Sequence, residues 1–283
     1  MKKAYPVSVL CWLLNVSRSG FYGYQAAECG PVDPQRAEKV AWVKDVDRAS
    51  GSSYGTRRMA RALQALGYRV GRYQARTLMR RAGIQVRYRR RYRVTTDSAH
   101  RQPVFENRLA RHFTVEMPDR VYASDITYIW THQGWLYLAV VLDLYSRKVV
   151  GWSLDRRLGQ RLVCDALQMA LWQRQPTRGQ LMHHSDRGSQ YASRAFRQLL
   201  ERDDITGSMS RKGNCWDNAV VESFFGTLKT ERVARQHYQT RDQARTDIVD
   251  YITMFYNPKR LHSALDYQSP DDFEKNSRLA MVA

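Results

Sequence analysis

The sequence has no long hydrophobic run. A helix that crosses a bilayer needs about 18 or more consecutive apolar residues, and the chain of 283 residues contains no such stretch. The longest candidate, residues 135–144, is short and already contains Asp143. The apolar segment at 7–16 is interrupted by polar residues and lacks a following small-residue cleavage site, so it does not match a signal peptide. We therefore expect no membrane span, and the cytoplasm is the default location.

Cysteine and histidine are too sparse for a zinc site or a disulfide framework. The four cysteines, Cys11, Cys29, Cys164 and Cys215, are widely separated and form no Cys-x-x-Cys pair, the spacing that zinc and redox motifs use. No histidine precedes His100, which excludes a zinc finger ahead of that point. We expect the cysteines to be ordinary reduced thiols.

Negative charge is missing where positive charge is densest. The chain has a formal net charge of +19, and residues 54–94 contain thirteen arginines but no lysine and no acidic residue. A solvated surface usually mixes both signs, whereas contact with nucleic acid uses arginine to neutralise phosphates. The alternative is an unusually basic solvated face. The pattern favours DNA or RNA as the partner.

A helix-turn-helix is predicted within this basic region. Thr56 can cap a helix that runs to Leu66, Gly67 ends it, and a second helix spans 71–81. The apolar residues of both helices recur on one face. The outer face of the second helix, where a recognition helix meets a major groove, carries Arg72, Arg76 and Arg80. The alternative is an amphipathic hairpin that contacts protein.

A second basic segment follows the predicted hairpin. Arginines alternate with aromatic residues between 85 and 96, a composition that suits phosphate contact and base stacking. Its candidate DNA-binding residues are Arg87, Arg89, Arg90 and Arg91, with Tyr88 and Tyr92 between them.

The pattern changes to alternating strands and helices near residue 113. Three runs rich in Val, Ile, Tyr and Trp predict an antiparallel meander, and helices and short strands then alternate. The expected strands are 121–130, 134–145, 148–154, 180–184 and 205–209, and the expected helices are 159–172, 193–202 and 218–229. This order predicts an α/β, ribonuclease-H-like domain.

Three carboxylates of this domain are candidates for phosphodiester chemistry, which commonly uses two divalent cations held by acids. Asp125 lies inside the first strand, where a charge is costly unless it is paired or metal-bound. Asp186 ends the fourth strand, and ligands collect at strand ends in α/β sheets. Glu222 lies on a helix whose apolar residues pull it onto the core.

The roles of other polar residues near these acids remain open. Asp143 is either a ligand or an ion-pair partner of Arg147. His183 and His184 are better explained as packing or supporting residues, because magnesium prefers oxygen. Asn218, one turn before Glu222, either orders the waters of a metal site or satisfies the helix start.

Five sequence blocks in order span the predicted α/β domain: Asp125-Ile126-Thr127-Tyr128, Leu142-Asp143-Leu144-Tyr145-Ser146-Arg147, His184-Ser185-Asp186-Arg187-Gly188-Ser189-Gln190-Tyr191, Gly213-Asn214-Cys215-Trp216-Asp217-Asn218-Ala219 with Glu222-Ser223-Phe224-Phe225, and Tyr256-Asn257-Pro258-Lys259-Arg260-Leu261-His262-Ser263-Ala264-Leu265. Two N-terminal blocks precede them, Tyr54-Gly55-Thr56-Arg57-Arg58 and Gly67-Tyr68. In these blocks the chain resembles the insertion-sequence transposases of the IS3 family, within the retroviral-integrase superfamily. Between Asp186 and Glu222 lie 35 residues, the interval that the family uses.

The resemblance implies a DDE recombinase that cleaves DNA and transfers strands at insertion-sequence ends. Asp125, Asp186 and Glu222 would hold two Mg²⁺ ions, for which Mn²⁺ can substitute, and Lys229 would contact the DNA end. It also implies a homo-oligomer on DNA, fusion or association with an upstream ORF A product, and a bacterial cytoplasmic, nucleoid-associated location. The predicted division is a short helical segment at 1–30, a DNA-binding region at 35–94, a linker at 95–112, an integrase-type catalytic domain at 113–275 and a tail at 276–283.

Two rival functions fit parts of the sequence. A non-catalytic DNA-binding repressor would keep the helix-turn-helix on a degenerate scaffold, but the complete acid triad argues against it. A ribonuclease-H-type nuclease would cut DNA without joining strands, and a joining assay separates it from a transposase.

Overall fold

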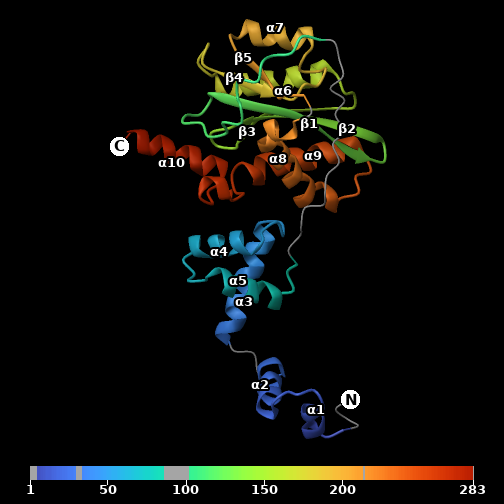
Figure 1. Cartoon of the computed structure of the whole chain (residues 1–283), viewed down its shortest axis with the longest axis vertical. Coiled ribbons are helices and arrows are strands. Elements are labelled where there is room, and N and C mark those ends of the chain that lie inside the picture. The colour runs from blue at the N-terminus through green and yellow to red at the C-terminus, as the bar shows by residue number, and fades with distance from the viewer. Residues whose placement is uncertain (1–4, 30–33, 86–101, 213, 283) are drawn as a thin grey trace.

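The computed structural model describes residues 5–29, 34–85, 102–212 and 214–282. The part from residue 34 to 85 is entirely helical, and the part after residue 102 contains one β-sheet with helices on both faces (Figure 1). We call these parts the helical unit and the sheet domain. The sheet domain provides the framework for the predicted carboxylates.

The sheet has five strands in the order β3-β2-β1-β4-β5. The first three form the predicted antiparallel meander, and β4 and β5 run parallel to β1. Parallel neighbours require crossover connections, which two helices, α6 and α7, supply. The observed strands are β1 (Val121–Thr131), β2 (Gly134–Asp143), β3 (Val149–Asp155), β4 (Met182–Ser185) and β5 (Thr206–Met209). This topology confirms the ribonuclease-H-like prediction.

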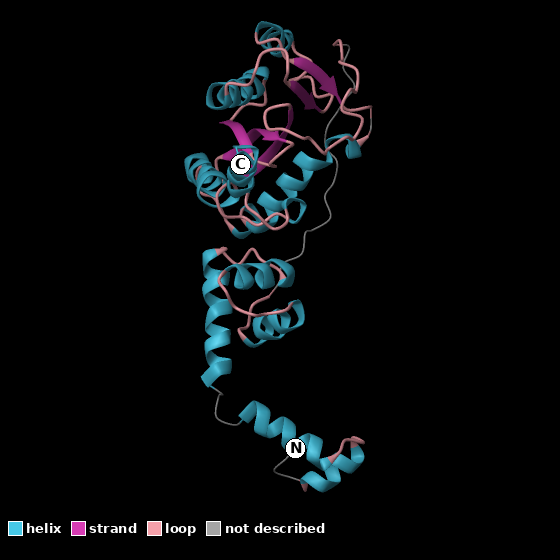
Figure 2. Cartoon of the chain, turned by 90° about the vertical axis from the view of Figure 1, so that its left-hand side faces the viewer, coloured by secondary structure: helices cyan, strands magenta, loops and turns pink. Residues whose placement is uncertain are grey.

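Helices cover both faces of the sheet (Figure 2). Side chains alternate along a strand, so Leu138 and Val140 of β2 enter one hydrophobic cluster while Ala139 and Val141 enter another. The first cluster contains residues of α8 and α9, and the second contains residues of α6 and α7. The bounds are Gln160–Arg174 for α6, Arg194–Arg202 for α7, Ala219–Glu231 for α8 and Arg241–Asp250 for α9.

The contact between β3 and α6 depends on a glycine. A Cβ atom on Gly151 would lie 2.3 Å from the carbonyl oxygen of Ala166 and 2.9 Å from the Cβ of Ala170. We expect Gly151→Ala to lower the free energy of unfolding by about 1–3 kcal/mol, because backbone atoms of a packed helix must move. Thermal unfolding measures this.

The matched control is Gly159→Ala. A Cβ at Gly159 would meet no described atom within 4 Å, and Gly159 precedes the same helix. Equal melting temperatures for the two variants would contradict the packing argument.

The helical unit consists of three helices around one core. They are α3 (Pro34–Ala49), α4 (Thr56–Ala65) and α5 (Arg72–Arg81), and Met59, Leu63 and Leu78 are buried among them. Gly67 ends α4 with a φ of +87°, as predicted. The predicted cap is wrong: Thr56 is the first helical residue, and Gly55 stands at the N-cap without a side-chain hydrogen bond.

The remaining elements lie either before the helical unit or within the sheet domain. At the N-terminal end, α1 (Val7–Leu13) and α2 (Arg18–Cys29) form a separate hairpin, in which Ser17 Oγ accepts a hydrogen bond from the Gly20 N–H at 3.0 Å. None of the described helices is long and apolar enough to span a bilayer. The others are η1 (Cys215–Asn218), η2 (Val233–Arg235), the π-helix η3 (Tyr251–Tyr256), η4 (Ser263–Leu265) and α10 (Pro270–Val282).

Candidate active site

Two of the predicted carboxylates lie at neighbouring positions of the sheet. Strand β1 pairs in parallel with β4, and Ser124 is opposite Ser185 in that register. Asp125 and Asp186 each follow that pair by one residue. The strand register therefore places the two aspartates side by side at the end of β4.

A side-chain hydrogen bond brings the third carboxylate to the same place. Asn218 donates from Nδ2 to the carbonyl oxygen of Ser124 at 3.0 Å, which joins the start of α8 to β1. Glu222 lies four residues further along, in the first turn of α8, and α8 contacts β1. Its charge reaches Asp125 and raises the pKa of that carboxyl group.

The three acids share one electrostatic environment. Burial raises the pKa of Asp125 well above its usual value, and the charge of Asp186 raises it further. The Ile126 N–H, which donates to Asp125 Oδ1 at 2.7 Å, acts in the opposite direction, and Glu222 adds a smaller increase. The structure thus assembles the predicted triad around Asp125.

Asp186 is held by a tight turn. The Gly188 N–H donates to Asp186 Oδ1 at 2.9 Å. A Cβ atom at Gly188 would lie 3.0 Å from this oxygen and 3.1 Å from Gln190 Oε1. The glycine therefore permits close approach of the backbone to the carboxylate.

Lys229 belongs to the same surroundings. It is half-buried, its Nζ lies 5.0 Å from the centre of the Tyr128 ring, and its charge lowers the pKa of Asp125. Burial in turn lowers the pKa of Lys229. The predicted DNA contact thus lies within reach of the acids and on the same helix as Glu222.

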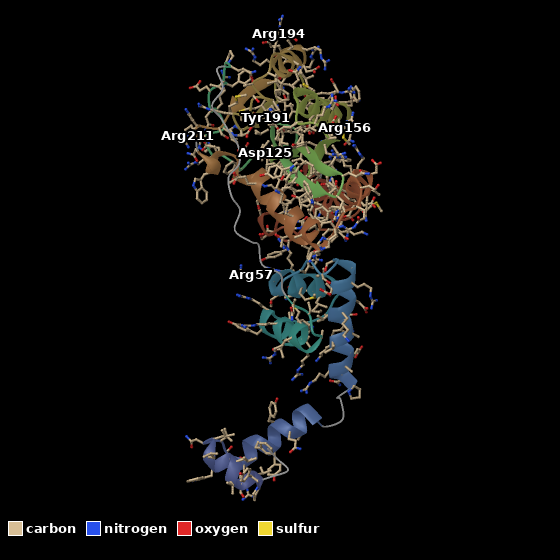
Figure 3. All side chains as sticks on the ribbon, turned by 90° about the vertical axis from the view of Figure 1, so that its right-hand side faces the viewer. Arg57, Asp125, Arg156, Tyr191, Arg194 and Arg211 are labelled. Carbon is tan, nitrogen blue, oxygen red and sulfur yellow. The ribbon has the colours of Figure 1, made fainter. Side chains whose placement is uncertain are left out.

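Two buried polar atoms near the acids have no hydrogen-bond partner among the described residues: the hydroxyl of Tyr191 and Oδ1 of Asn218. Tyr191 is 2% exposed, and the charges of Asp125 and Asp186 both raise its pKa; Figure 3 shows it beside Asp125. Tyr191 was not among the residues predicted for the site, although it is the last residue of the block that begins at His184. A buried group normally has a partner, so these atoms mark a site built for an additional polar group.

The donor set suits a hard divalent cation, since the acids, Tyr191 and Asn218 all offer oxygen. The charge of Lys229 lowers the pKa of Asp125 and so opposes the effect of the two other acids. No three histidine, cysteine or carboxylate side chains of the described residues converge closely enough to hold an ion together. The three acids therefore lie near one another, but among the described residues their carboxylate groups are not close enough together to coordinate one ion.

The two histidines of β4 support the strands. His183 Nε2 lies 2.7 Å from Ser124 Oγ, and His184 Nδ1 lies 2.9 Å from Ser208 Oγ. Burial lowers the pKa of His183 to about 3 and that of His184 to about 4, so both rings are neutral at pH 7. They bond to serines of neighbouring strands, in agreement with the supporting role expected for them.

Asp143 does not form the ion pair considered from the sequence. Its carboxylate accepts the N–H groups of Asp119 and Tyr145, each at 2.9 Å, and lies 3.6 Å from Arg174. Arg147 has a left-handed φ of 59° and donates instead to the carbonyl oxygen of Phe113. Asp143 is therefore a structural residue at the end of β2, away from the triad.

Asp217 anchors the loop that leads into α8. Its side chain is fully buried and accepts hydrogen bonds from Arg111, Arg211 and Asn107 at 2.8–3.0 Å. The hydrogen bonds from Arg211, followed by those from Arg111, hold the pKa of Asp217 well below its usual range. The neighbouring Asn218 is thereby fixed against β1.

This depressed pKa predicts a pH-dependent contribution to stability. An aspartate whose pKa is lower in the folded state stabilises the fold above its unfolded pKa of about 3.9 and loses that contribution as the pH falls below it. We expect Asp217→Asn to melt below the wild type at pH 7, with the gap narrowing below pH 4. Thermal unfolding across pH 2–8 measures this difference in melting temperature.

The control is Asp242→Asn, because the Asp242 side chain is 95% exposed. Its melting temperature should follow that of the wild type at every pH. A difference between Asp217→Asn and the wild type that stays constant with pH would contradict the assignment.

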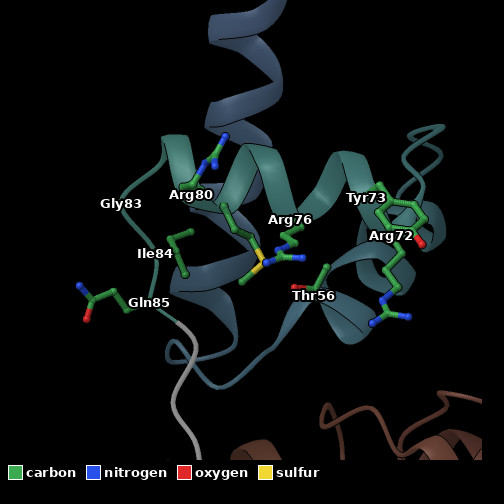
Figure 4. Close-up of a pocket in the computed structure, with 9 residues that line it drawn as sticks. Thr56, Arg72, Tyr73, Arg76, Arg80, Gly83, Ile84 and Gln85 are labelled. Carbon is green, nitrogen blue, oxygen red and sulfur yellow. The ribbon is translucent and has the colours of Figure 1, made fainter. Parts of the chain in front are cut away.

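The arginines predicted on the recognition helix lie on α5, the third helix of the helical unit, around one pocket (Figure 4). Arg72, Arg76 and Arg80 are exposed and line a pocket together with Tyr73, which is 82% exposed. The predicted contacts Arg87, Arg89, Arg90 and Arg91 lie outside the described residues. Within the described part, α5 presents a positively charged face with an aromatic ring.

Three family models match the chain. An integrase core domain matches residues 115–215, a second integrase core model matches 222–278, and an HTH-like domain matches 34–92. The transposase InsF for insertion sequence IS3A of Escherichia coli K12 is 39% identical over 278 residues, which is 98% of this chain and 96% of the relative. An uncharacterised 31 kDa protein of insertion element IS600 from Shigella sonnei is 39% identical over 279 residues, 96% and 100% of the two chains.

Solved structures resemble the chain more distantly. A simian T-cell lymphotropic virus intasome in complex with PP2A regulatory subunit B56 gamma has a TM-score of 0.49 and 17% identity, covering 76% of this chain and 70% of that chain. The HTLV-2 integrase catalytic core domain in complex with magnesium has a TM-score of 0.44 and 16% identity, covering 56% and 97%.

Proposed function

The chain belongs to the IS3 family of insertion-sequence transposases, and on this basis we propose that Asp125, Asp186 and Glu222 perform metal-dependent cleavage and strand transfer at the ends of an insertion sequence. The observation that carries the proposal is the position of Asp125. It is desolvated and lies within the fields of both other acids. Such a cluster is unfavourable by itself and is typical of functional sites.

The three carboxylates would hold two divalent cations, Mg²⁺ or Mn²⁺. When bound, a pair of such ions activates the attacking oxygen and stabilises the leaving oxygen of a phosphodiester. The oxygen atoms of Tyr191 and Asn218 that have no hydrogen-bond partner among the described residues support this assignment, because they add polar groups close to the acids.

The protein's own residues position the reactants. Lys229, on the same helix as Glu222, would bind a phosphate of the DNA end, and the arginine face of α5 would bind the duplex. Asn218 keeps Glu222 against β1. Catalysis then depends mainly on orientation and on electrostatic stabilisation of the transition state.

The reaction sequence uses one site twice. Water attacks the phosphodiester at the element's end and frees a 3′-hydroxyl. That hydroxyl then attacks a target phosphodiester, so that a new phosphodiester bond forms, the target's P–O3′ bond breaks and a 3′-hydroxyl of the target strand leaves. No serine or tyrosine nucleophile is required, so no covalent enzyme intermediate forms. We further propose a homo-oligomer on DNA, cooperation with an upstream ORF A product and a location in the bacterial cytoplasm at the nucleoid.

The test compares the wild type with Glu222→Gln in nicking and joining assays on oligonucleotides that carry the element's ends, with Mg²⁺ or Mn²⁺. The chain is assayed alone and fused to the upstream product. The matched control is Glu201→Gln, an exposed glutamate on α7. We expect metal-dependent joining by the wild type and the control and none by Glu222→Gln. Nicking without joining would favour a nuclease, and joining by Glu222→Gln would refute the site.

A further inference from the structure

Three of the hydrogen bonds that attach the helical unit to the sheet domain involve one short segment, residues 259–261. Tyr54 donates from its hydroxyl to the carbonyl oxygen of Lys259 at 3.0 Å and accepts from the Leu261 N–H at 3.2 Å. Arg58 donates from Nε to the carbonyl oxygen of Leu261 at 2.9 Å. Two residues of the helical unit thus pair with the backbone of residues 259–261.

A buried ion pair lies directly behind this contact. Glu231 and Arg260 are 8% and 3% exposed, and their side chains form two hydrogen bonds of 2.6 and 2.8 Å. Tyr251 donates to the same carboxylate at 2.8 Å. From the helical unit, Arg58 Nη1 approaches Glu231 Oε1 to 3.8 Å. The buried network therefore includes groups from both parts of the molecule.

Further contacts surround the network. Arg235 donates to the carbonyl oxygens of Gly51 and Ser52, and the Arg61 guanidinium lies 5.2 Å from the centre of the Tyr267 ring. Phe255 and Leu261 of the sheet domain pack against the core of the helical unit. The two parts therefore share both apolar and polar contacts.

The helix that receives this contact also carries a triad residue. Glu231 is the last residue of α8, and Glu222 lies nine residues earlier on it. Nine residues of α-helix span about 14 Å, and a packed helix moves as one body. In the other direction, α4 shares the core of the helical unit with α5, which carries Arg72, Arg76 and Arg80.

We propose that Tyr54, Arg58, Glu231, Tyr251 and Arg260 form an interdomain clamp that sets the distance between the DNA held on α5 and the carboxylate triad. They are positioning residues for strand transfer, and the inference rests on the proposed function. A fully bonded buried polar network fixes one arrangement of its members. The clamp therefore determines which phosphodiester of the bound duplex lies at the site.

The first test measures the contact itself. The variant Tyr54→Phe/Arg58→Ala keeps the buried ring of Tyr54 and removes the bonds to residues 259–261. Its control is Arg156→Ala, which removes an exposed arginine from the sheet domain (Figure 3). Hydrogen–deuterium exchange on the DNA-free protein should show faster exchange in residues 257–267 of the clamp variant only. Unchanged exchange would overturn the clamp.

The second test measures positioning. On oligonucleotides that carry a complete element end and Mg²⁺, the wild type and Arg156→Ala should join at one phosphodiester. The clamp variant should join about 10- to 100-fold less, because small misplacement of reacting groups has effects of this order, and its products should spread over neighbouring positions. Metal-dependent nicking of short duplexes and the melting temperature of the sheet domain should stay unchanged.

A second pair of variants perturbs the same contact more strongly, so that the positioning role is tested even when the first variant changes joining only slightly. Arg58→Glu places a negative charge next to Glu231, and Arg156→Glu, the same charge reversal at an exposed arginine of the sheet domain, is its control. If Arg58→Glu speeds exchange in residues 257–267 but joins at one position with the control's yield, the positioning role is refuted. If the wild type lacks metal-dependent joining, the proposed function fails, while the exchange result still decides whether the five residues hold the interface.

Discussion

Asp125→Asn is expected to abolish strand joining and, at the same time, to raise the melting temperature of the metal-free protein. The charge of Asp125 is desolvated and faces the charges of Asp186 and Glu222. Asparagine keeps the shape and removes the repulsion, so the fold gains stability. It also removes a ligand oxygen with its charge, so joining should fall by at least about 10³-fold.

Thermal unfolding and joining assays on the same preparations check this result. For a domain of this size, a rise of roughly 2–4 °C corresponds to about 1 kcal/mol. Added Mg²⁺ should raise the melting temperature of the wild type by ligand linkage but have little effect on Asp125→Asn.

The control is Asp165→Asn, whose carboxylate is 54% exposed and forms a surface ion pair with Arg161. Such pairs contribute little, so both activity and stability should stay near those of the wild type. If Asp125→Asn joins DNA normally, or melts below the metal-free wild type, the role assigned to Asp125 is wrong.

The second large effect concerns the arginine face of α5. Replacing Arg72, Arg76 and Arg80 together by alanine should weaken duplex binding by roughly 10²-fold or more, since each arginine that reads a base edge contributes about 1–3 kcal/mol. The slope of log K against log salt should become shallower by up to about 3, because each phosphate contact contributes about 0.9. Binding titrations over a series of salt concentrations measure both quantities.

The matched control removes the same charge elsewhere. Arg156, Arg157 and Arg161 are exposed on the sheet domain, and Arg156 is visible in Figure 3. Their triple alanine variant should bind the duplex much more tightly than the α5 variant, and both should keep the wild-type melting temperature. Equal losses of affinity in the two variants would mean that net charge, rather than the α5 face, holds the DNA.

Several features were predictable because their signals are local. The β-branched and aromatic runs matched β1, β2 and β3, and Gly67 ended its helix as expected. Asp125 was recognisable as a candidate because a carboxylate within an apolar strand is costly unless it is paired or bound to a metal. The family blocks then singled out Asp125, Asp186 and Glu222, and the structure brings these three together.

Other features depended on contacts between distant residues. Thr56 was a plausible cap, but the chain enters α4 through Gly55 in an extended conformation. Asp143 has Arg147 nearby in sequence, yet the fold brings Arg174 to it. Tyr191 carries no sequence signal for an unpaired hydroxyl, because pairing is decided by every element around it.

The sequence by itself determined the elements and the residue types of the site, because periodicity, turn residues and charge act over a few positions. Only the tertiary structure decided that Ser124 lies opposite Ser185, which makes Asp125 and Asp186 neighbours. It alone decided that Arg58 reaches Glu231 across 172 intervening positions of the chain. Strand register and interdomain contacts depend on how whole surfaces fit together, and no short stretch of sequence encodes that fit.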